Sequence, residues 1–149
     1  DNNNCTGTAG KFYYCYPANN SCNGGVNAGT LDGGGDSEGW TTCNELNVNP
    51  PGGFSGRTTW RVPTKNELKT IVYCSDGTPI PLIDYSSCGL DSPTINAHIF
   101  PNTDASGFWS SSGADYDSVY AWYVDFSIGM ASDWEKVIDM KIRCVSFGP

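Results

Sequence analysis

The chain has 149 residues and a formal net charge of −8 at pH 7, from 8 basic and 16 acidic side chains. This length is typical of one domain with its own hydrophobic core, and the acidic balance disfavours nucleic-acid binding, which needs a basic surface. No apolar run approaches the roughly 20 residues of a membrane-spanning helix. Because the chain begins at Asp1 rather than at a methionine, we expect a processed chain or a fragment.

Cysteine usage indicates an oxidising compartment. The seven cysteines lie at positions 5, 15, 22, 43, 74, 88 and 144, and no two of them form a C-x-x-C pair. With His98 as the single histidine, zinc ligation and thioredoxin chemistry lack their signatures. The cysteines therefore predict disulfides in a secreted or cell-surface protein. Since seven is odd, one thiol stays free or bridges to another chain.

Residues 1–36 form a segment rich in Cys, Gly and Asn, ahead of a predicted domain at 37–149. Around this boundary, Asp32, Asp36 and Glu38 place three carboxylates on a glycine-rich loop, and oxygen ligands on a tight turn suit Ca²⁺. The alternative is a glycine hinge that ends at a helix N-terminus, where acidic side chains favour the helix dipole. Calcium is therefore a candidate cofactor.

Two short helices are predicted in the first half of the domain. Residues 37–47 have Ser37 as an N-cap and apolar side chains at helical spacing. Residues 64–73 begin with a T-x-x-E capping box formed by Thr64 and Glu67.

The long segment 74–106 is irregular and rich in Pro, Ser and Asp. A loop of this length inside a domain needs a staple or a function, so we predict a disulfide between Cys74 and Cys88. A second candidate calcium site combines acidic residues around the end of this loop: Asp104, Asp115 and Asp117.

The rest of the chain is predicted to form an antiparallel meander of strands at 107–111, 119–126 and 137–147, with a turn at 127–130. In the second strand, Tyr120, Trp122, Val124 and Phe126 are expected inward, and Ala121, Tyr123 and Asp125 on the other face. In the third, Ile138, Met140, Ile142 and Cys144 are expected inward, and Asp139, Lys141 and Arg143 outward. Cys144 suits a buried bridge to a helix, and Cys43 in the first helix is the best partner. The fold class is α+β, with helices packed on a small twisted sheet.

Five sequence blocks resemble the bacterial DUF1566 family, also known as the C-terminal domain of the Legionella collagen-like adhesin. They are residues 59–68 (TWRVPTKNEL), 100–103 (FPNT), 108–112 (FWSSS), 121–129 (AWYVDFSIG) and 141–145 (KIRCV). The blocks follow the family's order and cover the chain from about residue 37 to 147. The resemblance implies a C-type-lectin-like fold, in which a cysteine of the first helix bridges to the last strand. It also implies a homo-oligomer.

An enzyme is not expected. Formylglycine-generating enzymes share the implied fold but use a close pair of reactive cysteines, and the last third of this chain has only Cys144. His98 lies in a proline-flanked loop without a G-x-S-x-G motif nearby. Lectin calcium motifs of the E-P-N or Q-P-D type are also absent.

Two groups of residues are candidates for ligand binding. The first is a basic stripe near the second helix, formed by Arg61, Lys65 and Lys69; the resemblance implies sulfated glycosaminoglycans as one ligand class, although the net acidic field opposes polyanions. The second group is aromatic and consists of Tyr116, Tyr123 and Trp134, whose rings could stack on sugars if they are exposed.

These observations favour an extracellular bacterial binding or adhesion module that recognises a glycan or a protein on a surface. The alternative is a structural subunit of an extracellular assembly such as a fibre, a pilus or a trimeric stalk head. The cysteine-rich N-terminal segment and the odd cysteine motivate that alternative. A formylglycine-type oxidase is the most remote candidate.

Overall fold

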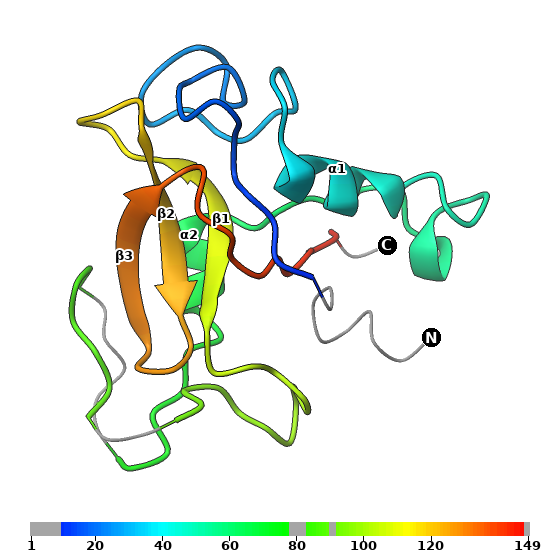
Figure 1. The fold of residues 1–149 in the computed structure, drawn as a ribbon. Coiled ribbons are helices and arrows are strands. Elements are labelled where there is room, and N and C mark those ends of the chain that lie inside the picture. Colours follow the sequence, from blue (N-terminus) through cyan, green and yellow to red (C-terminus); the bar gives the residue numbers. More distant parts are fainter. Residues whose placement is uncertain (1–9, 78–82, 90–91, 148–149) are drawn as a thin grey trace.

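The computed structural model describes residues 10–77, 83–89 and 92–147. Within these ranges, two short α-helices and one 3₁₀ helix precede a three-stranded antiparallel sheet (Figure 1). The helices are α1 (Glu38–Glu45), η2 (Phe54–Gly56) and α2 (Lys65–Lys69), and the strands are β1 (Gly107–Gly113), β2 (Tyr120–Asp125) and β3 (Met130–Glu135). The predicted α+β class is confirmed.

Both α-helices begin where the sequence predicts. The Ser37 hydroxyl accepts a hydrogen bond from the Trp40 backbone N–H at 3.0 Å, which caps α1. At α2 the capping box of Thr64 and Glu67 is complete. However, α2 is shorter than predicted: Thr70 is its C-cap, and Val72 then forms an antiparallel bridge with Ile95, within the long loop.

The sheet has the order β1-β2-β3, with antiparallel neighbours. A tight turn joins β2 to β3, and Gly129 adopts a left-handed φ of 71° in it. A Cβ at this position would lie 2.5 Å from the sulfur of Cys88, so the turn requires glycine sterically as well as conformationally. The turn brings β3 directly back onto β2, so that Trp122 lies opposite Asp133.

The predicted third strand at 137–147 is wrong. Strand β3 forms earlier, and residues 138–147 make only isolated bridges, including one between Met140 and Phe12 and one between Lys141 and Phe108. Their expected alternation also fails, since Ile138 is exposed and Arg143 is buried. The physical reason is the turn at Gly129, which starts β3 before the alternating sequence begins. The later segment therefore lies at the edge of β1 that faces away from β2, where Lys141 bridges to Phe108.

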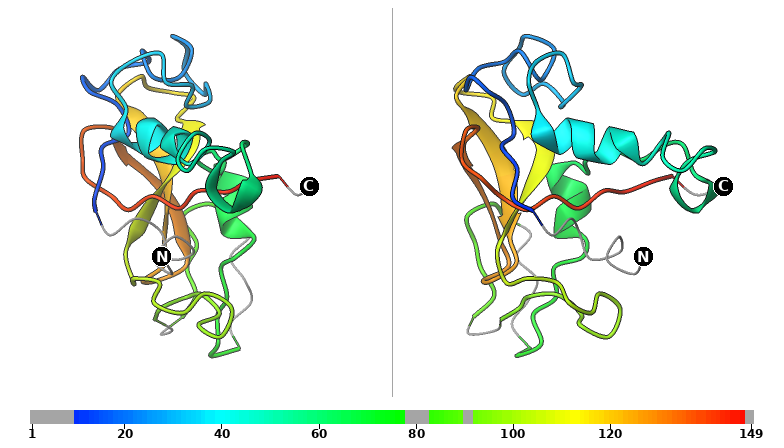
Figure 2. Two further views of the ribbon diagram at one scale, coloured as in Figure 1. Left: turned by 90° about the vertical axis from the view of Figure 1, so that its right-hand side faces the viewer. Right: turned by 45° about the vertical axis from the view of Figure 1, so that its right-hand side comes forward.

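Both faces of the sheet are covered. Residues 11–16 lie on one side and α2 on the other (Figure 2). One cluster contains Trp109 and Tyr123, and the opposite cluster contains Leu68 and Val124. Tyr123 was expected on an exposed face, but only 9% of it is exposed, because the N-terminal segment and the chain beyond β3 pack over it.

Three disulfides join segments of the described chain. Cys43 is bonded to Cys144 and Cys74 to Cys88, as predicted, and the third disulfide joins Cys15 to Cys22. The sequence left open which two of Cys5, Cys15 and Cys22 pair with each other, and Cys5 lies outside the described residues. Tyr14, Cys15, Cys22 and Leu31 share a hydrophobic cluster with Cys43 and Ile142. The N-terminal segment and the predicted domain at 37–149 thus contribute to one core.

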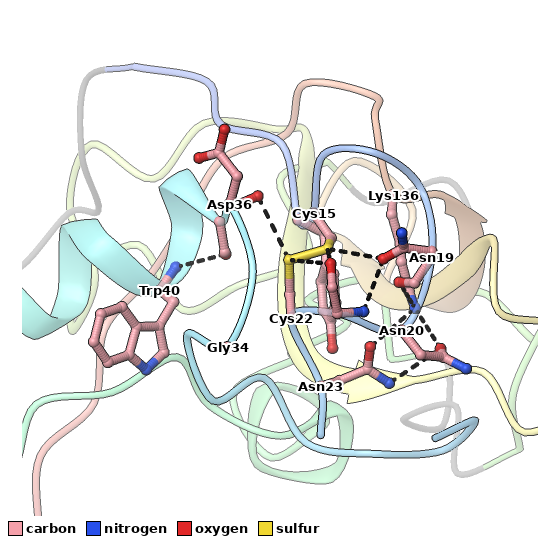
Figure 3. Close-up of a disulfide and its surroundings, with 12 residues drawn as sticks. Cys15, Asn19, Asn20, Cys22, Asn23, Gly34, Asp36, Trp40 and Lys136 are labelled. Carbon is pink, nitrogen blue, oxygen red and sulfur yellow. Dashed lines mark hydrogen bonds between the residues drawn. A yellow bond between two sulfur atoms is a disulfide. The ribbon is translucent and has the colours of Figure 1, made fainter. Parts of the chain in front are cut away.

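A buried lysine ties the N-terminal loop to the end of the sheet. Lys136 is fully buried, directly after β3. Its ammonium donates to the backbone oxygens of Asn19 and Ser118, both at 2.8 Å, and to the side-chain oxygens of Asn20 at 3.0 Å and Asn23 at 3.2 Å (Figure 3). Burial lowers the pKa of Lys136 to about 8, which leaves the group mostly protonated at pH 7.

Candidate ligand-binding site

Two tyrosines share one carboxylate on the α2 side of the sheet. The Tyr85 hydroxyl donates to Oδ1 of Asp133, and the Tyr116 hydroxyl donates to Oδ2 of the same side chain. Tyr85 comes from the loop after Cys74, Tyr116 from the connection between β1 and β2, and Asp133 from β3. Three separate segments are therefore held together at one point, and both rings have a fixed position.

Two further rings extend this arrangement. The Tyr85 ring lies 5.5 Å from that of Trp122, and the Tyr116 ring stacks on that of Tyr120 at 6.0 Å. Tyr85 is 57% exposed and Tyr116 is 59% exposed, while the other two are half-buried. We call these four aromatic residues, together with Asp133, the tyrosine platform.

The backbone also positions Tyr85. Its N–H donates to the carbonyl of Ala131 at 2.8 Å, so the loop is hydrogen-bonded to the outer side of β3. Tyr85 has a φ of 64°, a left-handed conformation that is uncommon for a residue other than glycine. Such strain persists only when surrounding contacts impose it, and here the bonds to Ala131 and Asp133 do so.

The hydroxyl groups of Tyr85 and Tyr116 stay protonated at physiological pH. The hydrogen bond to Asp133, with burial and the negative charge of that carboxylate, raises the pKa of Tyr85 to about 12. The same hydrogen bond, followed by the same secondary causes, raises the pKa of Tyr116 above its ordinary value. Tyr85 and Tyr116 therefore present neutral rings beside one half-buried carboxylate.

Two of the predicted basic residues lie at the edge of the platform. The Lys65 ammonium lies 3.6 Å above the centre of the Trp122 ring and binds Asp84 at 2.6 Å, while Lys69 binds the other oxygen of Asp84 at 2.9 Å. Burial raises the pKa of Asp84, but the hydrogen bonds from the two lysines outweigh it and lower this pKa below its ordinary value. One aspartate thus offsets one of the two lysine charges in the predicted basic stripe.

The other predicted binding residues are placed elsewhere. Arg61 forms a bidentate pair with Glu67, at 2.6 and 2.8 Å, beside the start of α2. Trp134 is 51% exposed, but it lies on the opposite face of the sheet, where it pairs with Ala121. The structure therefore brings Tyr116, Lys65 and Lys69 near one another and separates Arg61 and Trp134 from them.

The candidate calcium ligands do not assemble into a cage. Among the residues that the structure describes, no three His, Cys, Asp or Glu side chains lie together as they would around a metal ion. In the first set, the Asp32 carboxylate accepts the Gly34 N–H at 2.9 Å, and the Glu38 carboxylate accepts the Tyr13 N–H at 3.2 Å. The third member, Asp36, accepts the Tyr16 N–H through its backbone oxygen. Calcium binding stays a prediction.

The second acidic set is similarly dispersed. Asp104 forms an ion pair with Lys141 at 3.0 Å, and the Asp117 carboxylate accepts the Val119 N–H at 2.9 Å within a turn. Asp115 lies close enough for its charge to contribute to the raised pKa of Tyr85. These carboxylates therefore serve a salt bridge, a turn and the edge of the platform.

Tyr120 and Trp122 of this site were expected to face the core, and three further residues were not predicted from the sequence: Asp84, Tyr85 and Asp133. Two of them lie in an irregular loop without periodicity, and the third belongs to a strand that the sequence did not predict. Tyr85 precedes Cys88 by only three positions. The predicted Cys74–Cys88 disulfide was therefore the one signal that fixed this loop near the sheet.

Comparison with protein families gives one match. The model of the family described as the Lcl C-terminal domain matches residues 5–146. The match includes most of the N-terminal segment, which the sequence analysis had placed outside the resembling blocks. Comparisons with curated proteins and with solved structures found no match.

Proposed function

This chain belongs to the Lcl C-terminal domain family, and from this premise we propose that it is an extracellular adhesin-like module that binds a surface glycan at the tyrosine platform. The proposed activity is binding without catalysis. The disulfide between Cys43 and Cys144, with the two others, supports an oxidising compartment outside the cytosol. No helix within the described ranges has the length and apolar character to span a membrane.

One observation carries the choice of site: a single carboxylate holds two half-exposed tyrosine rings in place. A ring that is already fixed loses little conformational entropy when a ligand stacks on it. Tyrosine also combines an apolar face with few rotatable bonds, which makes it a common binding anchor. The C–H face of a sugar ring can pack on Tyr85 or Tyr116 while its hydroxyl groups reach the carboxylates of Asp133 and Asp84.

A glycan array tests this proposal. Fluorescently labelled full chain is applied to the array beside the double variant Tyr85→Ala/Tyr116→Ala. Loss of two anchor residues is expected to weaken binding at least about tenfold, since truncating a single interface anchor costs 1 to 2 kcal/mol or more. The matched control is Tyr73→Ala, which removes a ring that is 46% exposed but outside the platform and should leave binding unchanged.

Binding by the double variant at the wild-type level would contradict the proposal. The same array, run with Ca²⁺ and with EDTA, tests the candidate cofactor. Equal binding in both buffers would remove calcium from the account, and binding only with Ca²⁺ would support it. The alternative role as a structural subunit predicts a disulfide-linked oligomer on a non-reducing gel and no array binding.

A further inference from the structure

A cavity of about 340 Å³ lies on the face of the sheet opposite the tyrosine platform. It is open to solvent, and its walls come from the β2–β3 face, the start of β1, the returning chain at 138–141, and Lys11 of the N-terminal segment. The half-exposed indole of Trp134 stands in its wall. Its volume is at the lower end of the range for small-molecule sites, which is about 300 to 1,000 Å³.

The wall of the cavity is kept open by a glycine. Gly107, at the start of β1, lines the cavity. A Cβ on this residue would lie 3.1 Å from the Tyr123 ring and 3.2 Å from the sulfur of Met140, which is tighter than ordinary van der Waals contact. The apolar part of the wall therefore includes the Trp134 indole, the Tyr123 ring, the Met140 thioether and the Ile138 side chain, next to the Gly107 backbone.

The charges around the cavity balance. Lys11 and Lys141 contribute two positive groups, and Asp125 and Asp139 contribute two negative ones. Lys141 is also paired with Asp104 at 3.0 Å, and Oδ1 of Asp125 accepts two hydrogen bonds from Ser127. A ligand with net charge of either sign would meet a like charge at the rim, whereas a purely apolar ligand would desolvate these groups without hydrogen bonds to replace water.

We propose that this cavity is a second binding site, which takes one neutral sugar ring stacked on Trp134. A neutral pyranose presents an apolar C–H face to the indole and a rim of hydroxyl groups to the charged side chains. Carboxylates accept hydrogen bonds from hydroxyl groups and ammonium groups donate to them, so mixed charges at a rim suit a polyhydroxylated neutral ring. The site does not depend on the tyrosine platform, which lies on the other face of the sheet.

Saturation-transfer NMR on the full chain tests the proposal. The probes are the methyl glycosides of glucose, galactose, mannose and N-acetylglucosamine, with uridine as a neutral stacking ring of another class. At least one methyl glycoside is expected to receive saturation, with a dissociation constant on the order of 1 mM, as is usual for a small ligand in a shallow site. In the Tyr85→Ala/Tyr116→Ala background, which removes the platform rings, Trp134→Ala should abolish the remaining signal and Trp134→Phe should retain part of it.

Two comparisons separate this site from the platform and from loss of fold. The Tyr85→Ala/Tyr116→Ala background removes the anchor rings of the platform, so the saturation that remains comes from the cavity; adding Tyr73→Ala, which alters an exposed ring outside both sites, should leave that signal unchanged. The dispersion of amide signals shows whether the Trp134 variants are folded. We expect them to fold because Trp134 is about half exposed to solvent. Saturation of uridine alone, of no probe at all, or of a glycoside to the same extent when folded Trp134→Ala is added to that background would overturn the proposal.

Discussion

Asp133 determines the properties of both tyrosines that contact it. Each carboxylate oxygen accepts one hydroxyl, and a hydrogen bond to an ionised acceptor is about twice as strong as a neutral one. Neither Tyr85 nor Tyr116 is deeply buried, so the partner rather than the environment decides where these rings lie. The binding proposal therefore depends on a residue that carries no aromatic surface itself.

Replacing this carboxylate should change how Tyr85 titrates. In the wild type the pKa of Tyr85 is raised to about 12, first by its hydrogen bond to Asp133. In Asp133→Asn this pKa should move toward the ordinary value of about 10. Tyrosinate absorbance during an alkaline titration, compared with Tyr85→Phe to assign the transition, measures it. An unchanged Tyr85 transition in Asp133→Asn would show that the carboxylate does not hold the ring.

The same shift has a consequence for stability. A folded-state pKa above the unfolded value means that the native state retains the proton more tightly. The contribution of Tyr85 is therefore complete below about pH 10 and is lost as the pH rises toward about 12.

At the scale of elements, α2 depends on its first turn because it is only five residues long. Such a short helix is not stable by propensity alone. The Glu67 carboxylate accepts the Thr64 backbone N–H in the capping box, and it also accepts hydrogen bonds from both terminal nitrogens of Arg61. Arg61 in turn pairs with Val145 near the end of the chain. The capping box thus connects a local helix start to the terminal segment.

This arrangement predicts acid sensitivity. The hydrogen bonds from Arg61, opposed by burial and supported by Thr64, lower the pKa of Glu67 to about 2 from an ordinary 4.5. Because the folded pKa is the lower one, the contribution is complete above about pH 4.5 and is lost as the pH falls toward 2. Urea unfolding measured across this range should show that the free energy of unfolding falls as the pH is lowered. Glu67→Gln should make this fall smaller. If the free energy of unfolding depended on pH equally in the wild type and in Glu67→Gln, this explanation of the helix start would be wrong.

The N-terminal loop depends on Lys136 in a comparable way. Lys136→Met keeps a long side chain but leaves four oxygen atoms without their ammonium donor. A buried acceptor left without a hydrogen-bond donor costs about 1 to 3 kcal/mol. Hydrogen exchange should therefore become faster at the amides of residues 15–31, with little change in β2. Uniform acceleration over the whole chain would show instead that the loop and the sheet unfold together.

Sequence patterns predicted the local features of this fold better than the distant ones. Ser37, Thr64 and Glu67 act over three or four positions, so their caps were predictable. Alternation in β2 showed two faces, but it could not show that both are covered, because the chain that covers Tyr123 comes from both ends of the sequence. The strand at β3 was missed since its partly polar sequence forms a strand only after the turn at Gly129 places it beside β2.

At the scale of the whole molecule, an adhesin domain does not need a tight single site. Many copies on one surface raise the overall strength of attachment by about 10² to 10⁴ without any new contact, provided that the geometry allows simultaneous binding. A shallow aromatic platform with weak affinity for one glycan is compatible with firm attachment of a cell or particle. The net charge of −8 disfavours approach to polyanionic surfaces, so neutral glycans are the expected ligands of the platform.

The most direct test measures the retention of beads coated with the full chain on a glycoprotein surface under flow, before and after glycosidase treatment. We predict that wild-type and Tyr73→Ala beads are retained on the untreated surface and lost from the treated one. Beads carrying Tyr85→Ala/Tyr116→Ala should be lost from the treated surface and retained much less than wild-type beads on the untreated one. Equal retention of wild-type beads on the deglycosylated surface, or full retention of the double variant, would contradict glycan binding at the tyrosine platform.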